Sequence, residues 1–395
     1  MPKMNIVSPL NPNLIDTGTP PIPEAYAWTA RYDGSAGPLI NMAQAAPGSP
    51  PPPELLRRLG EGAADPAAAR YGAISGDGPL RKAYAAEQSA LYGAEIGEGE
   101  VIVTTGCNLA FFVSMLALAK AGDNVLLPAP WYFNHHMALQ MLGIEARVLP
   151  LDAEAGFVPD PEVAARLIDG RTRAIVLVTP NNPTGAVYPA ATIARFADLT
   201  GQRKIWLVLD ETYRDFLPAG AGRPHDILRR PDWRTHVLQL YSFSKAYCIP
   251  GHRLGAITAG AQIVPELEKA LDTMIINPPR PSQAAIAWGI GNLALWRAGT
   301  RAEINRRGEA CRTALGALND WRVSSLGAYF AYVRHPFPGT SSLKVAEALA
   351  TARGVLTLPG VYFGPDQDTH IRIAFANAGV DVIAQLPDRL RGLRV

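Results

Sequence analysis

A lysine set between hydroxyl side chains and an arginine is the part of this sequence with the greatest capacity for chemistry. It is Lys245, in the segment Tyr241–Gly255, which reads YSFSKAYCIPGHRLG and overlaps the end of an apolar run. Apolar surroundings and a nearby cation lower the pKa of a lysine, so that its amine can attack an aldehyde. Ser242, Ser244 and Arg253 could bind a phosphate, because arginine supplies a planar fork of donors. Most single lysines keep their ammonium group in water, but these neighbours favour the chemical interpretation.

Two further segments place polar residues where apolar runs end. The segment Val208–Tyr213 reads VLDETY, and open α/β sheets bind ligands at the carboxyl ends of their strands, so Asp210 is a candidate ligand-binding carboxylate. A strand-end cap or a turn is the alternative explanation. The segment Thr179–Gly185 reads TPNNPTG, and its Asn, Pro and Gly content taken alone indicates a tight turn.

Three other segments combine a chemical interpretation with an ordinary one. In Val103–Ala110 a glycine joins an apolar run to a helical pattern, and the N–H groups that open such a helix make an anion site, although a common strand-to-helix turn looks the same. The aromatic-rich Leu127–His136 could supply a flat partner for a flat ring, or it could be core. In the alternating run His370–Phe375, Arg372 faces one side, and such an arginine usually lies in solvent.

The elements that must position these residues are the strands of an α/β domain. Short β-rich runs alternate with helical patterns, which is typical of a mostly parallel sheet. The predicted strands are Val101–Thr104, Asn124–Leu127, Ile144–Leu149, Ala174–Val178, Ile205–Leu209, His236–Tyr241 and Leu254–Thr258. The predicted helices among them are Leu109–Ala119, Pro161–Leu167, Pro189–Leu199 and Val264–Ile275.

The C-terminal part of the chain has a different pattern, which predicts a smaller α+β domain. A helical pattern covers Ser282–Leu318, strands come after it at Ala328–Val333, Val355–Leu358 and His370–Ala374, and a helix is predicted at Ser342–Thr351. The residues before Asn41 are too few for a core of their own, so we expect them to pack on this domain. The predicted division is a large domain at 46–282 and a small domain made of 1–45 and 283–395.

The composition excludes several classes of protein. The 395 residues are 48% hydrophobic and 18% charged, with a net charge of +2, which favours a folded soluble protein and gives no electrostatic reason to bind nucleic acid or a membrane. The three cysteines include no CxxC pair, so we expect neither a disulfide framework nor a metal site. The first residues lack the apolar core of a signal peptide, so a cytoplasmic location is expected. The sequence has no P-loop and no dinucleotide-binding glycine motif.

The segment SFSKAYCIPGHRLG resembles the lysine signature of class I and II aminotransferases, the aspartate aminotransferase superfamily of pyridoxal 5′-phosphate (PLP) enzymes. The TPNNPTG and DETY segments, and LPGVYFG at 358–364, are similar to other motifs of that family and stand in its order. The resemblance runs from about Asn41 to the C-terminus. It implies fold type I, with a large α/β domain and a smaller α+β domain, and a homodimer with shared active sites. It also implies that Lys245 holds PLP as a Schiff base and transfers the catalytic proton.

The resemblance assigns roles around the cofactor ring. It implies that Asp210 pairs with the pyridine nitrogen, which strengthens the ring as an electron sink, and that Tyr213 hydrogen-bonds the cofactor's 3-oxygen. Asn182 matches the asparagine that contacts the same oxygen and the substrate carboxylate. His135 falls where some relatives place a histidine behind the aspartate.

Further cofactor contacts are implied by the same resemblance. Gly106, Cys107 and Asn108 are implied to hold the cofactor phosphate, although Cys107 departs from the small residues common there. Backbone contacts tolerate that change. Tyr132 matches the aromatic residue that stacks on the ring, with Trp131 as a close competitor.

Three residues are implied to act on the substrate or across a dimer. Arg372 matches the arginine that binds the substrate α-carboxylate as a bidentate pair. Tyr71 resembles the tyrosine that reaches the cofactor phosphate of the neighbouring subunit. Ala45 stands where the family has a glycine whose backbone covers the substrate carboxylate, and this departure affects how closely the backbone can approach.

We therefore expect an aminotransferase that moves an amino group between an α-amino acid and a 2-oxo acid. A lyase, cyclase, oxidase or decarboxylase that uses the same cofactor is the alternative, because none of the motifs dictates the reaction after the proton is lost. A non-catalytic PLP-sensing regulator is the alternative from another class. Such relatives carry a DNA-binding domain ahead of this fold, and here only about forty residues and no basic helix stand there.

The segment Asp272–Gln283 bears on the choice of substrate. Relatives that are specific for aspartate supply a second arginine from this region. Arg280 lies in it, but an ungapped match places Asp272 nearer the key position. This favours a neutral or aromatic amino donor over a dicarboxylic one.

Overall fold

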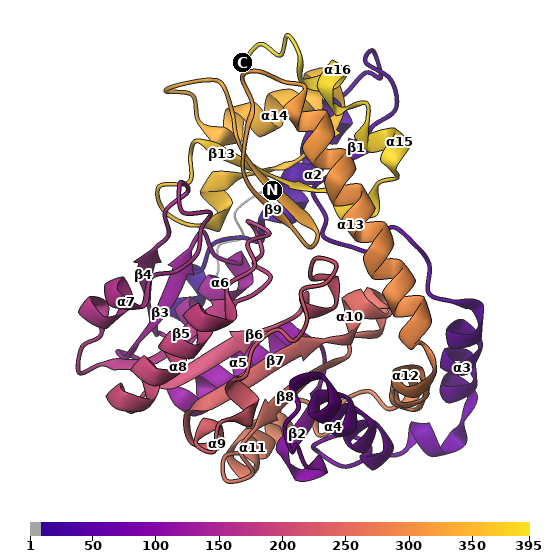
Figure 1. The fold of residues 1–395 in the computed structure, drawn as a ribbon, viewed down its shortest axis with the longest axis vertical. Coiled ribbons are helices and arrows are strands. Elements are labelled where there is room, and N and C mark those ends of the chain that lie inside the picture. Colours follow the sequence, from indigo (N-terminus) through magenta and orange to yellow (C-terminus); the bar gives the residue numbers. More distant parts are fainter. Residues whose placement is uncertain (1–8) are drawn as a thin grey trace.

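The seven apolar runs predicted as strands form the large sheet. Six of them are buried on both faces, as in parallel sheets generally, whereas the edge strand at 145–150 is mostly partly exposed. The computed structural model describes residues 9–395. Its seven-stranded sheet has the order β2-β8-β7-β6-β5-β3-β4 (Figure 1). The strands are β2 (Val101–Thr104), β3 (Asn124–Ala129), β4 (Glu145–Pro150), β5 (Thr172–Val178), β6 (Trp206–Asp210), β7 (Val237–Ser242) and β8 (Gly255–Ala259).

Strand β8 runs against both of its neighbours in this sheet. It is antiparallel to β2 and to β7, whereas the pairs among β3, β4, β5, β6 and β7 are parallel. The predicted mostly parallel sheet is therefore confirmed. The register places Val178 opposite Asp210 and Asp210 opposite Leu240. The carboxyl ends of β5, β6 and β7 thus meet at one edge, where three of the candidate segments begin.

Helices cover both faces of the large sheet, because alternate strand residues belong to two different cores. One core joins Val125 and Val208 to α5 and α11, and the other joins Leu177 and Leu207 to α4, α8 and α12. The helices of this part are α3 (Pro53–Ala64), α4 (Gly78–Tyr92), α5 (Cys107–Leu118), α6 (Phe133–Met141), α7 (Pro161–Leu167), α8 (Ala190–Arg203), α9 (Trp233–His236), α10 (Phe243–Ala246), α11 (Val264–Ile275) and α12 (Pro281–Asn292).

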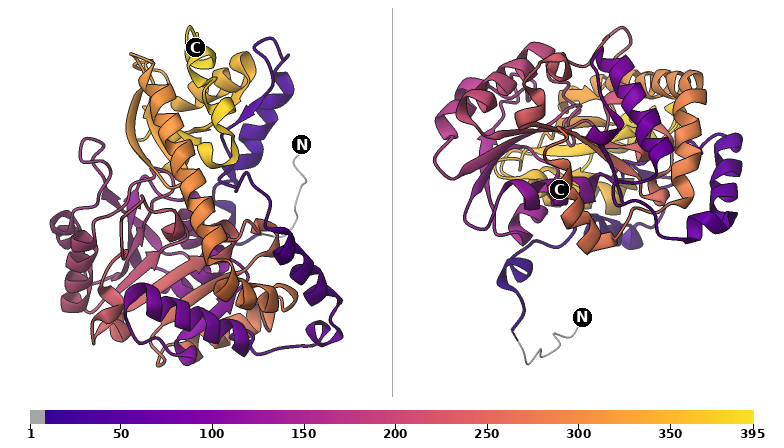
Figure 2. Two further views of the ribbon diagram at one scale, coloured as in Figure 1. Left: turned by 45° about the vertical axis from the view of Figure 1, so that its right-hand side comes forward. Right: turned by 90° about the horizontal axis from the view of Figure 1, so that it is seen from below.

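A four-stranded antiparallel sheet of order β12-β13-β10-β9 forms a second lobe, called the small lobe below. Strand β1 pairs in parallel with β11, which joins the N-terminal segment to this lobe. The long helix α13 extends between the two lobes, with its first residues near the large sheet and its last residues in the small lobe (Figure 2). The elements are α1 (Pro12–Ile15), α2 (Pro21–Trp28), β1 (Ile40–Asn41), α13 (Ala294–Gly316), β9 (Arg322–Gly327), β10 (Phe330–Arg334), α14 (Ser342–Arg353), β11 (Val355–Leu356), β12 (Leu358–Pro359), β13 (His370–Ala374), α15 (Val380–Ile383) and α16 (Leu386–Leu390).

Parts of the small lobe and its connection differ from the prediction. The pattern at 282–318 forms two helices, α12 and α13, that part at Leu293. Gly289 and Gly291 come just before this break, and each glycine in a helix costs about 1 kcal/mol relative to alanine. The run Val355–Leu358 is divided between β11 and β12, which belong to different sheets. The sequence does not predict β9, because its partly exposed residues show no alternation. The domain division at 46–282 stays a prediction, and residues 1–8 of its N-terminal part lie outside the described residues.

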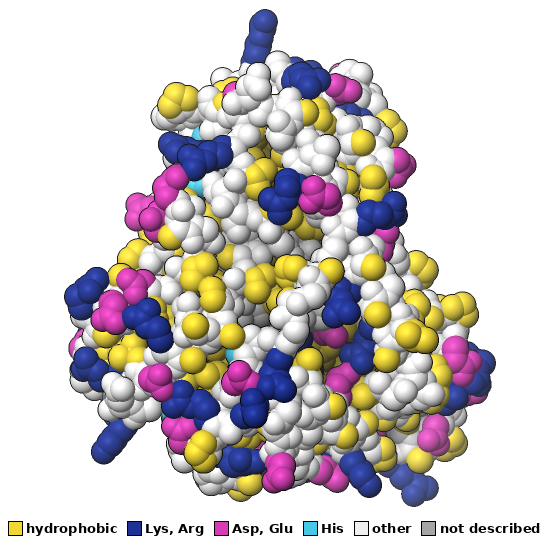
Figure 3. Space-filling model, viewed as in Figure 1, with side chains coloured by type: hydrophobic (Ala, Val, Ile, Leu, Met, Phe, Trp, Pro, Cys, Tyr) yellow, Lys and Arg dark blue, Asp and Glu magenta, His cyan; other side chains and the backbone are white. Residues whose placement is uncertain are grey.

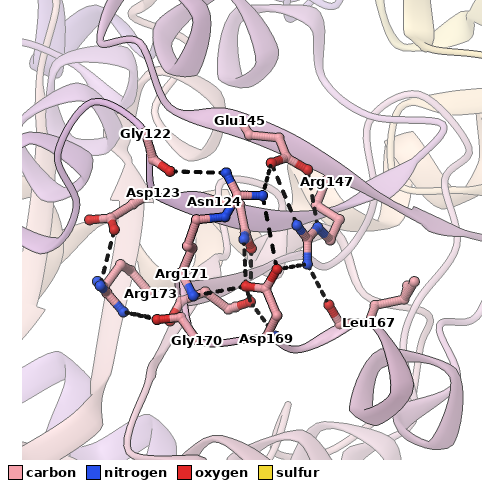
Figure 4. Close-up of polar contacts among 11 residues, drawn as sticks. Gly122, Asp123, Asn124, Glu145, Arg147, Leu167, Asp169, Gly170, Arg171 and Arg173 are labelled. Carbon is pink, nitrogen blue, oxygen red and sulfur yellow. Dashed lines mark hydrogen bonds and ion pairs between the residues drawn. The ribbon is translucent and has the colours of Figure 1, made fainter.

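A polar cluster around Asp169 ties together the amino-terminal halves of three strands (Figure 4). Asp169 accepts hydrogen bonds from Asn124 Nδ2 at 2.9 Å and from Arg147 Nη1 at 2.7 Å. These bonds, led by that from Asn124, hold the pKa of the Asp169 carboxyl well below its usual range. Thr172 Oγ1 donates to Asn124 Oδ1 at 2.8 Å, so β3, β4 and β5 are linked at the edge away from their carboxyl ends.

The surface carries charges of both signs. Basic and acidic side chains are interspersed over the face seen in Figure 3, in keeping with the small net charge of +2. All three cysteines are buried and unpaired. Within residues 9–395, none of the helices combines the length and the apolar character needed to cross a membrane.

Candidate active site

The carboxyl ends of β5, β6 and β7 open into a cavity of about 530 Å³ that extends to β13 of the small lobe. Residues from these strands, from α5 and α10 and from the N-terminal segment line it together. Of the residues assigned to the site from the sequence, Gly106, His135 and Tyr71 do not line this cavity, and all the others do. The fold thus gathers side chains that are far apart in the sequence around one space.

Lys245 lies on the single turn α10, directly after β7. Its Nζ donates a hydrogen bond to the carbonyl oxygen of Ala45 and lies 5.9 Å from the centre of the Tyr213 ring. Burial lowers the pKa of Lys245 to about 8, and the positive charges of Arg253 and Arg372 act in the same direction. Near neutral pH, part of the Lys245 population therefore has the neutral amine, which is the nucleophilic form.

The guanidinium group of Arg253 packs against the backbone of Gly106. A β-carbon on residue 106 would lie 2.2 Å from Arg253 Nη2, and the φ angle of Gly106 is +81°. Helix α5 begins immediately afterwards, and Cys107 and Asn108 both line the cavity. The free N–H groups of the first turn of α5 and the Arg253 guanidinium can bind the same anion.

Two serines complete the anion-binding end of the cavity. The Ser242 side chain caps α10 and accepts a hydrogen bond from the Ser244 N–H at 3.3 Å. The Ser244 hydroxyl is buried and has no hydrogen-bond partner among the described residues. A buried polar group without a partner is costly, so a ligand that accepts from this hydroxyl would be favoured.

Asp210, at the end of β6, is buried and held by several donors. His135 Nε2 lies 3.2 Å from its Oδ2, and the Thr212 N–H donates to its Oδ1 at 3.0 Å. Burial alone would raise the pKa of Asp210, but the hydrogen bonds and charge interaction with His135, together with Thr212, lower it overall. The Cys107 thiol, whose pKa burial raises well above its usual value, donates to Oδ2 at 3.7 Å. The ring of His135 stacks on Phe111, with 3.9 Å between centres.

Arg372, in the centre of the small antiparallel sheet, is buried with 2% of its surface exposed, so it does not face solvent. Its Nη1 donates to Asn182 Oδ1 at 3.0 Å and its Nη2 donates to the carbonyl of Ala43. The ring centres of Phe330 and Phe363 each lie 5.1 Å from the guanidinium. Burial lowers the pKa of Arg372 to about 10. Its Nε has no hydrogen-bond partner among the described residues, so this buried cation is suited to an incoming anion.

The structure distinguishes the two aromatic candidates at the start of α6. Tyr132 lines the cavity, and its hydroxyl accepts from Asn134 Nδ2 at 2.8 Å and donates to Asn108 Oδ1 at 3.4 Å. Trp131 is buried and stacks on His136, with 4.7 Å between ring centres. Tyr132 is therefore the one of the two that can face a ring in the cavity.

Tyr71 and the segment after α11 lie apart from the cavity. Tyr71 is 80% exposed, which is unusual for so large an aromatic side chain. Arg280 pairs with Asp77, with 3.0 Å between Nε and Oδ1, and donates to the carbonyl of Ala67 at 2.6 Å. Asp272 is exposed near the end of α11. Neither Arg280 nor Asp272 lines the cavity of its own chain.

Comparison with known proteins decides the family. A family model described as Aminotransferase class I and II matches residues 37–390. The chain belongs to this family. A valine–pyruvate aminotransferase of Mycobacterium tuberculosis is 29% identical over 92% of this chain and 94% of its own length. An aspartate aminotransferase of Pyrococcus horikoshii is 27% identical over 82% of this chain and 83% of its own.

Known structures support the same fold. An aspartate aminotransferase from Thermus thermophilus superposes with a TM-score of 0.89 over 98% of this chain and 100% of that chain, at 23% identity. At this identity the likeness concerns the fold, and it confirms the predicted fold class. Class I and II aminotransferases typically use PLP, and the expected aminotransferase activity is confirmed at the level of the family.

The aminotransferase cavity also contains residues that the sequence does not single out. Thr212, Phe133 and Asn134 are immediate neighbours of predicted residues, and their position in the DETY and aromatic segments could have indicated them. Gln44 is likewise the neighbour of the predicted Ala45. Pro20 and Ile22 also line the cavity, and no local signal marks these two, because only the packing of the N-terminal segment brings them to the strand ends.

Proposed function

We propose that Lys245 binds PLP covalently and that the chain transfers an amino group between an α-amino acid and a 2-oxo acid. The observation that carries the proposal is the position of the Lys245 amine, whose pKa is about 8, in one cavity with an anion-binding end and a buried arginine. The amine suits the aldehyde of the cofactor, the anion-binding end suits its phosphate, and the buried arginine suits the carboxylate of the substrate.

The residues present fit the cofactor. The contact between Gly106 and Arg253, which a β-carbon would block, and the unpartnered hydroxyl of Ser244 suit its phosphate. Asp210 is ionised at neutral pH and suits a protonated pyridine nitrogen. Tyr132 can stack on the ring. When bound, PLP withdraws electrons from the α-carbon of the amino acid and makes its proton acidic.

Residues of the chain bind the substrate carboxylate and transfer the proton. Arg372 and Asn182 hold the α-carboxylate, since their side chains are bonded to each other and both line the cavity, and the arginine supplies the donors that a carboxylate needs. The Lys245 amine is positioned to accept the proton from the α-carbon and to return it, as a general base and then a general acid. Tyr213 lies beside that amine, and burial holds the pKa of its phenol above the usual range, so it acts as a neutral donor.

We also propose a homodimer with shared active sites. The exposed Tyr71 is the support for it, because its hydroxyl is free to enter the phosphate-binding end of a second copy. The names of the relatives include aspartate, valine–pyruvate and aromatic aminotransferases, so they do not select one amino acid.

The test is to incubate the protein with PLP, reduce it with borohydride and map the modified peptide by mass spectrometry. We expect the pyridoxyl adduct on Lys245 and none in Lys245→Ala. Lys269→Ala, which removes an exposed lysine on α11, is the matched control and should keep the adduct. An adduct on another lysine in wild-type protein would overturn the proposal.

A second measurement tests the reaction itself. Holoenzyme mixed with an amino acid in the absence of a 2-oxo acid should yield pyridoxamine phosphate and one equivalent of 2-oxo acid. Consumption of the amino acid without pyridoxamine phosphate would instead indicate a lyase, decarboxylase or related reaction.

A further inference from the structure

We propose that the preferred amino donor is an α-amino acid with an uncharged, apolar side chain. This rests on the proposed function, because it concerns the part of the same cavity that receives the substrate side chain. Three features support it: the positions of the cations in the cavity, the apolar wall beside Arg372, and the contacts of Arg280.

Each basic side chain that lines the cavity already has a role in the proposed function. Among the described residues, Lys245, Arg253 and Arg372 are the basic side chains that line it. Arg253 packs on Gly106 at the anion-binding end, and Arg372 is bonded to Asn182. Lys245 is assigned to the aldehyde, Arg253 to the phosphate and Arg372 to the α-carboxylate. No basic side chain that lines this cavity is left for a second carboxylate.

The wall next to Arg372 is apolar. The centre of the Phe363 ring lies 5.1 Å from the Arg372 guanidinium, and the Phe133 ring lies 6.0 Å from the Phe363 ring. Phe133 also lines the cavity, as do Pro20 and Ile22 at the start of α2. Phe133, Pro20 and Ile22 form the surface of this patch, called the apolar wall, and the fully buried Phe363 packs between Phe133 and Arg372.

The side chains of this wall are held in place. Ile22 is half-buried and packs against the main core, and Phe133 packs against the same core. A substrate side chain placed here loses its contact with water. For an apolar side chain that transfer is favourable, whereas an unpaired carboxylate loses its hydration without gaining a partner.

Arg280 does not supply a cation for a second carboxylate in the cavity of its own chain. It is bonded to Asp77 and to the carbonyls of Ala67 and Arg70. These three partners occupy its Nε and its Nη1. Arg280 therefore cannot turn towards its own cavity without breaking an ion pair.

The first experiment uses wild-type holoenzyme and carboxylates that lack an amino group. The dissociation constants of 4-methylpentanoate, 3-phenylpropanoate and succinate are measured by titration calorimetry at one ionic strength. We expect the two apolar monocarboxylates to bind at least about tenfold more tightly than succinate. Equal or tighter binding of succinate would overturn the inference, including the case in which a second subunit supplies a cation.

The second experiment compares kcat/KM for the half-reaction with L-leucine, L-phenylalanine, L-aspartate and L-glutamate. Either apolar amino acid should exceed both acidic ones. A preference for L-aspartate or L-glutamate overturns this inference while leaving the proposed function intact. A PLP-loaded protein that reacts with no amino acid overturns both.

A substitution tests the wall directly. Ile22→Arg should lower kcat/KM for L-leucine and raise it for L-aspartate, which reverses their order. Leu295→Arg, the same kind of change at a residue that is 91% exposed and outside the cavity, should leave the order unchanged. Should Ile22→Arg fail to fold, the wild-type ligand series decides the question alone. A folded Ile22→Arg protein with the wild-type order would contradict the role of the wall.

Discussion

The guanidinium of Arg253 occupies the space that a β-carbon on Gly106 would take, 2.2 Å from Arg253 Nη2. The two residues lie on the loop before α5 and on the loop before β8, and β2 and β8 pair in such a way that these loops meet. Glycine at position 106 is therefore needed for two reasons: the φ angle of +81° and the close approach of a cation.

Gly106→Ala should weaken PLP binding by at least about tenfold, because the new methyl group displaces Arg253. Gly122→Ala is the matched control, since Gly122 has a φ of +87° and a β-carbon there would meet nothing within 4 Å. Both positions have a positive φ, so both variants should lose stability in urea unfolding, and the loss at Gly106 includes its φ and ψ of 81° and 165°, a region almost restricted to glycine. Only Gly106→Ala should raise the dissociation constant for PLP, measured by fluorescence titration. An equal rise in both variants would attribute the effect to strain.

The rate at which the apoenzyme captures PLP should depend on pH through Lys245. Its pKa is about 8, so the fraction of neutral amine rises about tenfold per pH unit below that value and levels off above it. Stopped-flow absorbance measures the capture rate. Arg253→Met and Arg372→Met each remove a positive charge that disfavours the ammonium form, so both should move the plateau to higher pH. A wild-type rate that still rises about tenfold per unit up to about pH 10 would show an unperturbed lysine.

Arg372→Lys should keep PLP bound but lose the fork of donors for the α-carboxylate. Hydrogen bonds with charged groups contribute about 1.5–3 kcal/mol each, so kcat/KM should fall about 10- to 100-fold. Steady-state kinetics, with the PLP content measured on the same sample, separates the two effects. Arg334→Lys, at an exposed position on β10, is the control and should behave as wild type. Unchanged kcat/KM in Arg372→Lys would remove Arg372 from substrate binding.

Tyr71 should act on the active site of a second subunit. The variants Tyr71→Ala and Lys245→Ala should each be nearly inactive as homodimers, but their hybrid has one site with both native residues. An equal mixture, after subunit exchange, should recover about a quarter of wild-type activity, because about half of the dimers are hybrids with one complete site. Native mass spectrometry checks that hybrids form. Hybrids without activity would place Tyr71 and Lys245 in the same site of one chain.

Local pattern predicts much of this fold and site. Apolar runs identify the seven strands of the large sheet, and every candidate segment except His370–Phe375, which is itself a strand of the small sheet, spans or follows the end of such a run. Lys245, Asp210 and Asn182 could be located because a strand end, the turn after it and the side-chain types are neighbours in sequence. Even the choice of Arg372 needed only the alternation of one strand and the family resemblance.

Tertiary packing decides what local pattern leaves open. The bond from Arg372 to Asn182 spans 190 positions, and Lys245 meets the Ala45 carbonyl across 200. The choice of Tyr132 over Trp131 depends on which ring the neighbouring segments bury, and the apolar wall exists only because the start of α2 and the start of α6 line the same cavity. Sequence determines which chemistry each segment can perform, whereas long-range burial determines which side chains share a cavity and which charges are left without a partner.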